Sequence, residues 1–202
     1  MTRERLLAVT VSNMFAGSDT TAISLRSIFY NLVKHPDDME SLLSELRHGQ
    51  EQGTINVTKD GLFTWSDVKD LPYLGAVIKE ALRVHPAVGL PLERIVPQGG
   101  VELCGHFLPS GTTVGCSAWT VHLNQVFGEC PHEFRPRRWL EASSEQHRAM
   151  EKAFLAFGAG ARTCIGKNIS LLEIYKLVPA LLTRFEVGCF PLCLLSLAKL
   201  TG

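Results

Sequence analysis

The stretch Phe157-Gly-Ala-Gly-Ala-Arg-Thr-Cys-Ile-Gly166 places a single cysteine, Cys164, in a glycine-rich loop. Apolar residues at helical spacing follow it and predict a helix over about residues 165–183. The glycines permit positive φ and a close approach of the backbone to another group. The helix N-terminus and nearby Arg162 are features that favour a thiolate. Cys164 is therefore a candidate nucleophile or metal ligand, and a buried free cysteine in a turn is the structural alternative.

The sequence before this loop predicts further helices and a group of short strands. Helices are expected over the first 35 residues, from Pro36 to about Gly49, in a short segment capped by Ser66, and from Pro72 to Val84. Short apolar runs between Gly and Pro predict strands and hairpins over residues 88–118, and residues 124–163 are expected to be irregular. The first helix is apolar on nearly all sides, which is typical of a helix buried in a large core. The expected fold class is mainly α with short β hairpins (α+β).

Composition excludes several classes of protein. Of the 202 residues, 46% are hydrophobic and 20% are charged, an ordinary globular mixture that argues against disorder. Lys+Arg and Asp+Glu each number 20, so no electrostatic case exists for a nucleic-acid partner. The six cysteines include no CxxC pair, which favours free thiols in a reducing compartment. Neither a membrane anchor nor a signal peptide is expected within this chain.

Phe157, Gly160, Arg162, Cys164 and Gly166 together read FxxGxRxCxG. This pattern resembles the cysteine-ligand loop of the cytochrome P-450 family, the haem-thiolate monooxygenases. The resemblance implies that Cys164 is the proximal ligand of the iron in haem b (iron protoporphyrin IX), that Arg162 faces a propionate and that Phe157 packs near the thiolate. A thiolate ligand pushes electron density through the iron and favours O–O cleavage. The implied reaction inserts one atom of O2 into a small apolar organic substrate, with electrons from a flavoprotein reductase.

Glu80 and Arg83 lie at i,i+3 spacing on one face of the helix expected from Pro72. Alone, such a pair is typical of a solvated surface. Followed by His85-Pro86, it resembles the family's ExxR motif, which implies that the pair binds Arg138 in Phe134-Arg-Pro-Arg-Arg-Trp139. Arginine can hold a carboxylate bidentately, so this network can fix a loop beneath the haem. Arg137 stands where the family has a glutamate, and it either weakens the network or points to solvent.

The six residues Ala16-Gly-Ser-Asp-Thr-Thr21 match the family pattern AGxDT(T/S). Without the resemblance they indicate a kinked buried helix, because Gly and Ser/Thr pairs bend helices. With it, the kink opens a groove for oxygen, and Asp19 and Thr20 relay protons as general acids acting through water. Arg94 matches the place of another propionate-binding arginine, with an ordinary edge-strand charge as the alternative. His122 is expected to pack or cap rather than bind iron.

These motifs occur in the family's order over residues 16–186 and cover about the C-terminal half of a family member. The resemblance implies the C-terminal half of the cytochrome P-450 fold, with residues 1–187 as a partial domain and 188–202 as a divergent tail that replaces a strand pair. Full-length relatives of this eukaryotic microsomal type, which includes fungal members, are expected to be anchored in the endoplasmic reticulum membrane. Three functions stay open: a monooxygenase or its catalytic half, a non-catalytic fragment that retains haem-binding motifs, and a thiol enzyme without haem.

Overall fold

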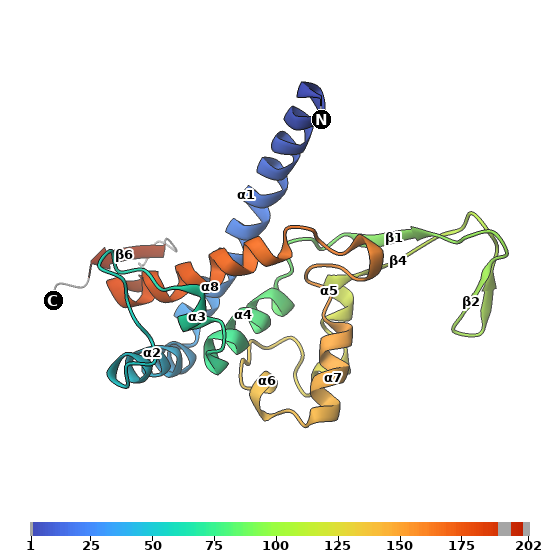
Figure 1. The fold of residues 1–202 in the computed structure, drawn as a ribbon. Coiled ribbons are helices and arrows are strands. Elements are labelled where there is room, and N and C mark those ends of the chain that lie inside the picture. Colours follow the sequence, from blue (N-terminus) through green and yellow to red (C-terminus); the bar gives the residue numbers. More distant parts are fainter. Residues whose placement is uncertain (1, 190–194, 200–202) are drawn as a thin grey trace.

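The structure is a computed structural model that describes residues 2–189 and 195–199. Its longer helices are α1 (Arg3–Lys34), α2 (Pro36–Glu51), α4 (Pro72–Val84), α7 (Ser144–Ala153) and α8 (Lys167–Arg184). Short helical segments are α3 (Trp65–Val68), α5 (Ala118–Val121), η1 (Gln125–Phe127), α6 (Arg138–Glu141) and η2 (Gly160–Arg162). This mainly helical arrangement with small hairpins (Figure 1) confirms the predicted fold class.

The strands form antiparallel pairs. Strand β1 (Pro91–Ile95) pairs with β4 (Thr113–Ser117), β2 (Val101–Leu103) with β3 (His106–Leu108), and β5 (Phe185–Cys189) with β6 (Leu195–Lys199). The pairs between residues 91 and 117 confirm the strands predicted there, and they form an arm that extends away from the helical body (Figure 1). The β5–β6 pair lies where the sequence predicted the end of the partial domain and the start of a divergent tail at residue 188. Residues 190–194 and 200–202 of the expected tail lie outside the described residues.

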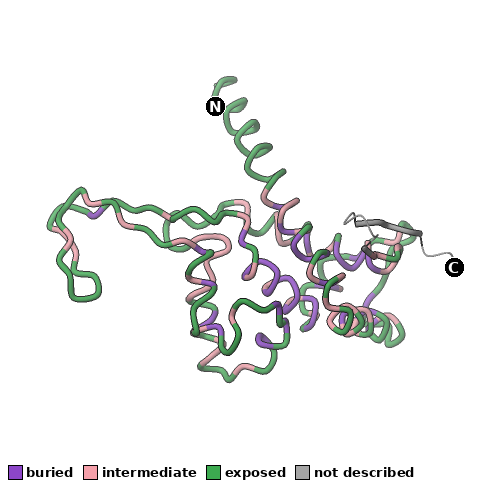
Figure 2. The backbone as a smooth tube through the Cα atoms, turned by 180° about the vertical axis from the view of Figure 1, so that it is seen from behind, coloured by how far each residue is buried: buried purple, intermediate pink, exposed green. Residues whose placement is uncertain are grey.

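Helix α4 lies at the centre of the main hydrophobic core. Its apolar residues recur at helical spacing and are buried together with residues of α1, α2 and α8 (Figure 2). The residues that pack in this way include Ile28, Leu32, Leu42, Leu46, Leu74, Val77, Ile78, Ala81, Ile174 and Val178. Each fully buried Val, Leu or Ile side chain among them stabilises the fold by roughly 1.5–3 kcal/mol. The core therefore fixes α4 as the scaffold of the polar site described below.

Helix α1 differs from the expected buried helix. Residues 2–19 are all exposed, and burial begins only at Thr21 (Figure 2). Leu7 and Phe15 are 64% and 71% exposed. The helix is continuous through residues 16–21, where the Thr20 hydroxyl donates to the carbonyl of Ala16 (2.7 Å). Among the described helices, none has both the length and the apolar character that crossing a bilayer requires.

The cap of α3 is Thr64 rather than the predicted Ser66. The Thr64 amide donates to the carboxylate of Asp67 (2.9 Å), three positions into the segment, which forms a capping box. Ser66 lies inside the helix, where its hydroxyl contacts the Thr64 hydroxyl (2.8 Å). The reach of Asp67 back to Thr64 therefore decides where the helix begins.

Helix α7 lies within the segment that we expected to be irregular. The Ser143 hydroxyl accepts a hydrogen bond from the amide of Gln146 (3.2 Å) and caps the helix. Met150 is its buried residue, so the helix carries little of the apolar periodicity that predicts helices.

Candidate functional site

The loop before α8 presents Cys164 at a helix N-terminus. Its amide donates to the carbonyl of Phe157 (2.8 Å), which closes the loop. Gly158 and Gly160 have φ of +72° and +68°, in the left-handed region that favours glycine. The Cys164 side chain is exposed. The backbone is therefore folded to bring one thiol to an open surface beside the positive end of a helix.

Two further predicted residues lie against this loop. Arg94 on β1 donates to the carbonyl of Ala159 (3.3 Å), so the strand arm and the loop meet there. Phe157 is half-buried against the main core, and the Lys167 ammonium lies 5.8 Å from the centre of its ring. The structure thus brings Arg94 and Phe157 to the Cys164 loop, while Arg162 lies in the loop with an exposed side chain.

The donor chemistry of the loop fits haem iron. One exposed thiol supplies a single metal ligand, and haem iron needs only an axial ligand because the porphyrin supplies the equatorial ones. Arg94 and Arg162 carry guanidinium groups that suit carboxylates such as propionates.

The three residues of the predicted network are brought together and buried. Glu80 Oε1 accepts from Arg83 Nη2 (2.8 Å) and from Arg138 Nε (2.8 Å), and Glu80 Oε2 accepts from Arg83 Nε (2.9 Å). Glu80, Arg83 and Arg138 are 0%, 1% and 6% exposed. Glu80 and Arg83 are therefore buried, although their i,i+3 spacing alone would indicate a solvated surface pair.

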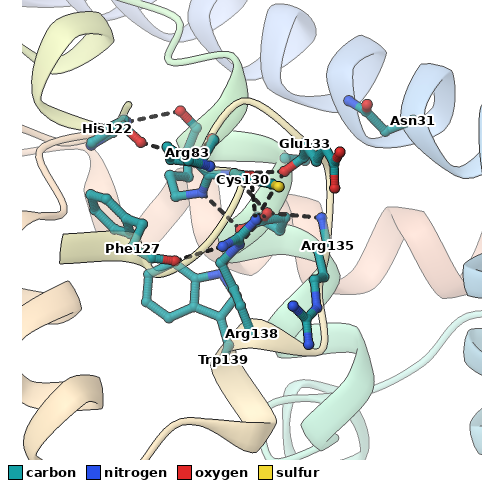
Figure 3. A network of polar contacts seen from close by, with 12 residues as sticks. Asn31, Arg83, His122, Phe127, Cys130, Glu133, Arg135, Arg138 and Trp139 are labelled. Carbon is teal, nitrogen blue, oxygen red and sulfur yellow. Dashed lines mark hydrogen bonds and ion pairs between the residues drawn. The ribbon is translucent and has the colours of Figure 1, made fainter. Parts of the chain in front are cut away.

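Sequence reasoning missed part of this network. The Trp139 indole donates to Glu80 Oε2 (2.9 Å), and the Arg135 amide donates to Glu80 Oε1 (2.9 Å). The remaining guanidinium N–H groups donate to carbonyls of the loop around them (Figure 3), which belong to His122, Phe127, Glu129, Cys130, Pro131 and Glu133. The only sequence feature that could have indicated a role for Trp139 in the network was its position directly after Arg138. The loop that contains residues 122–139 is thus wrapped around three charged side chains.

Arg137 lies outside the network. Its side chain is exposed and lines an open cleft that Glu40, Tyr73 and Leu140 also line. The positive charge of Arg137, which replaces the family's glutamate, therefore lies outside the Glu80 network. Of the two alternatives, a weakened network and a side chain that points to solvent, the structure has the second.

His122 is fully buried beside the network. Its Nδ1 lies 3.0 Å from the carbonyl of Arg83, and its Nε2 lies 2.8 Å from the amide of Leu155. Since a carbonyl only accepts and an amide N–H only donates, Nδ1 carries the proton and the ring is neutral. Burial lowers the pKa of His122 to about 4. A ring held in this way packs and caps backbone groups.

Asp19 and Thr20 lie on α1 where it passes α8. Asp19 is exposed and Thr20 is partly buried. The hydroxyl of the next residue, Thr21, lies 3.1 Å from the hydroxyl of Ser170 in the first turn of α8. The acid and hydroxyl motif is thus held against the helix that begins after Cys164.

Comparisons with known proteins agree on one family. A family model described as cytochrome P-450 matches residues 1–192. A cytochrome P-450 monooxygenase of Aspergillus terreus is 50% identical over 189 residues, which are 92% of this chain and 38% of that protein. One from Emericella nidulans is 46% identical over 178 residues, 88% of this chain and 35% of that protein. A zebrafish cytochrome P-450 solved with abiraterone has a TM-score of 0.75 and 29% identity, with 95% of this chain and 42% of that chain covered. The chain therefore spans about two fifths of the length of these relatives.

Proposed function

The chain belongs to the cytochrome P-450 family, and we propose that it carries the thiolate side of a haem monooxygenase, an oxidoreductase. The reaction inserts one atom of O2 into a small apolar organic substrate and takes electrons from a flavoprotein reductase. The observation that supports the proposal best is the exposed Cys164 thiol at the start of α8, in a loop closed by its own backbone. We propose endoplasmic reticulum membrane anchoring for the full-length relatives.

Haem b, when bound, supplies the iron chemistry that activates dioxygen. Cys164 would hold the iron through its sulfur, and the backbone hydrogen bond from the Cys164 amide to the Phe157 carbonyl fixes the position of this residue in the loop. Phe157, packed on the core, would lie against the thiolate side of the bound haem and limit access of water there. Exclusion of water strengthens the electrostatic interactions of a thiolate.

The arginines of the loop and the strand arm bind the propionates. Arg162 is free to turn toward a carboxylate because its side chain is exposed. Arg94 is held at the loop, because its Nη2 donates to the carbonyl of Ala159 and its Nη1 donates to the carbonyl of Glu93. Its exposed guanidinium group would bind a second carboxylate.

Asp19 and Thr20 move protons. The Asp19 carboxylate is exposed and is reached by water, and the Thr20 hydroxyl would pass a proton once it turns away from the Ala16 carbonyl. Such general acid catalysis requires groups within hydrogen-bond reach of the reacting atom.

A non-catalytic role is the second candidate. It is favoured by the exposure of residues 2–19 of α1, on which Asp19 lies. In this role the chain retains the haem-binding motifs, and the proton-relay residues stay in contact with bulk water and support no turnover.

The decisive experiment loads the purified protein with haemin, reduces it and adds carbon monoxide. A thiolate ligand gives a strongly red-shifted band, which Cys164→Ala should abolish and Cys116→Ala, at another exposed cysteine, should leave in place. Persistence of the band in Cys164→Ala would overturn the ligand assignment. Absence of any haem complex would favour the thiol enzyme. A band without reductase-dependent oxidation, when the chain is joined behind the N-terminal part of the Aspergillus terreus relative, would favour the non-catalytic role.

A further inference from the structure

His122 connects two parts of the site that lie far apart in the sequence, the helix that holds Glu80 and Arg83 and the loop that holds Cys164. On one side its Nδ1–H donates to the carbonyl of Arg83, the last member of the ExxR motif on α4 (3.0 Å). On the other side its Nε2 accepts from the amide of Leu155 (2.8 Å). Leu155 lies two residues before Phe157, whose carbonyl closes the Cys164 loop.

Leu155 is the anchor at the start of that loop. Its carbonyl accepts from the amide of Gly158 (2.9 Å), so the turn that leads to Cys164 is built directly on it. Its own amide has His122 Nε2 as its hydrogen-bond acceptor. An amide that loses its acceptor away from bulk water destabilises the structure that holds it. The position of the loop start therefore depends on one imidazole nitrogen.

Aromatic contacts fix the plane of the His122 ring. The ring stacks on Phe154, with centroids 5.3 Å apart and planes 9° apart, and meets the edge of Phe127 at 5.7 Å. Phe154 directly precedes Leu155, so stacking and hydrogen bonding act on the same two residues. His122 is 0% exposed, so water does not compete for either nitrogen.

We propose that His122 is a positioning residue that fixes the Cys164 loop relative to the Glu80–Arg83 helix. The proposal rests on the function proposed above only for its consequence, which is correct placement of an iron ligand. The placement itself is a property of the chain without haem. The charged groups that act most on the ring are Arg83 and Glu80. The neutral ring fits between the carbonyl of Arg83 and the amide of Leu155, because it offers one donor and one acceptor.

Two substitutions of His122 test its two hydrogen bonds one at a time. The amide of asparagine occupies the place of Nδ1, so His122→Asn can keep the bond to the Arg83 carbonyl and lose the one to Leu155. The amide of glutamine reaches the place of Nε2, so His122→Gln can keep the acceptor for Leu155. Amide hydrogen exchange and the alkylation rate of Cys164, both resolved by peptide mass spectrometry, report on the loop in the haem-free chain.

For His122→Asn we expect exchange over residues 155–164 and alkylation of Cys164 to rise about tenfold, the equivalent of one lost buried hydrogen bond. His122→Gln should stay within about threefold of wild type. The amides of Thr54 and Ile55 and the thiol of Cys104, which lie outside α4 and outside the cysteine loop, are internal controls and should not change. Equal effects of the two substitutions, or faster exchange spread over the whole chain, would overturn the proposal. A change limited to the loop supports it even if Cys164 proves not to bind iron.

Discussion

Glu80 is the residue on which the polar core depends, because its carboxylate accepts five hydrogen bonds from four residues. Two guanidinium groups depend on it for charge balance. We expect Glu80→Gln to lower the free energy of unfolding by about 3–5 kcal/mol, because it leaves buried charges unpaired. Urea unfolding measures this loss.

The effects of Glu80→Gln and Arg138→Met should not add, since both substitutions break the same network. Arg137→Met is a matched control at an exposed neighbour and should change stability by no more than about 0.5 kcal/mol. Independent and small effects of the two network substitutions would show that the network contributes little.

His122 gives the fold a defined sensitivity to acid. Its pKa is about 4 in the folded protein, against 6.5 for an ordinary histidine, so the unfolded chain binds more protons between these values. Stability is therefore unaffected above pH 6.5 and falls as the pH drops toward 4, by about 3 kcal/mol in total.

Urea unfolding at pH 7 and pH 4.5 measures this fall, and His122→Gln, which cannot titrate, should show a smaller one. An identical fall in the variant would mean that other groups cause it.

Site residues that lie close together in the sequence could be identified from the sequence alone. The cysteine loop and the pair Glu80 and Arg83 each occupy a few consecutive positions, so their spacing alone carried the resemblance. The bond from Trp139 to Glu80 joins residues 59 positions apart and depends on the path of the loop between them. Such long-range contacts have no local pattern. The contact of Arg138 with Glu80, 58 positions apart, was predicted only through the family resemblance, and that of Trp139 was not predicted.

At the scale of elements, α4 is capped by another helix. Its first turn begins with Pro72, which has no N–H, and its amides at Tyr73 and Leu74 donate to the two carboxylate oxygens of Glu45 on α2 (2.7 and 2.9 Å). Burial raises the pKa of Glu45, although both backbone bonds oppose this shift. A carboxylate at a helix N-terminus also interacts favourably with the helix dipole.

We expect Glu45→Ala to lower the free energy of unfolding by about 1–2 kcal/mol, the typical value of a helix cap. Glu45→Gln should cost less, because one oxygen still accepts. Glu40→Ala is the control, since Glu40 lies on the same helix with an exposed side chain and does not contact α4 through a hydrogen bond in the described residues. Equal costs for Glu45→Ala and Glu40→Ala would show that the cap has no role.

The elements with strong apolar periodicity were predicted close to their observed bounds, as for α4 and α8. Helix α7 was missed because its residues are mostly polar and its N-cap, Ser143, is a common residue in loops. The cap of α3 was misplaced because Thr64 and Ser66 are both good caps, and only the side chain of Asp67 distinguishes them.

For the whole molecule, the exposed part of α1 is the dominant feature (Figures 1 and 2). Leu6, Leu7, Val9, Met14 and Phe15 are each more than half exposed. Apolar area left in water costs about 25 cal/mol per Å², so a few hundred Å² offsets much of the roughly 5–15 kcal/mol that stabilises a domain. The sequence indicated that this helix is apolar on nearly all sides, but it could not show which sides this chain leaves uncovered.

We expect residues 1–202, expressed alone, to self-associate, to bind a hydrophobic dye strongly and not to oxidise a substrate. Leu7→Gln with Phe15→Gln should reduce the dye signal several-fold, whereas the same change at Leu90, on the strand arm, should not. The same chain joined behind the N-terminal part of the Aspergillus terreus relative should be monodisperse. A monodisperse, catalytically active preparation of residues 1–202 would contradict this expectation.

The central claim is that the sulfur of Cys164 binds haem iron, and X-ray absorption at the iron edge tests it most directly. The sample is the haem-loaded protein, either as residues 1–202 or joined to the N-terminal part of that relative. The account predicts one sulfur atom in the first shell of the iron, replaced by a nitrogen or oxygen atom in Cys164→His and retained in Cys116→Ala. A first shell without sulfur in the wild type, or one that keeps its sulfur in Cys164→His, would contradict it.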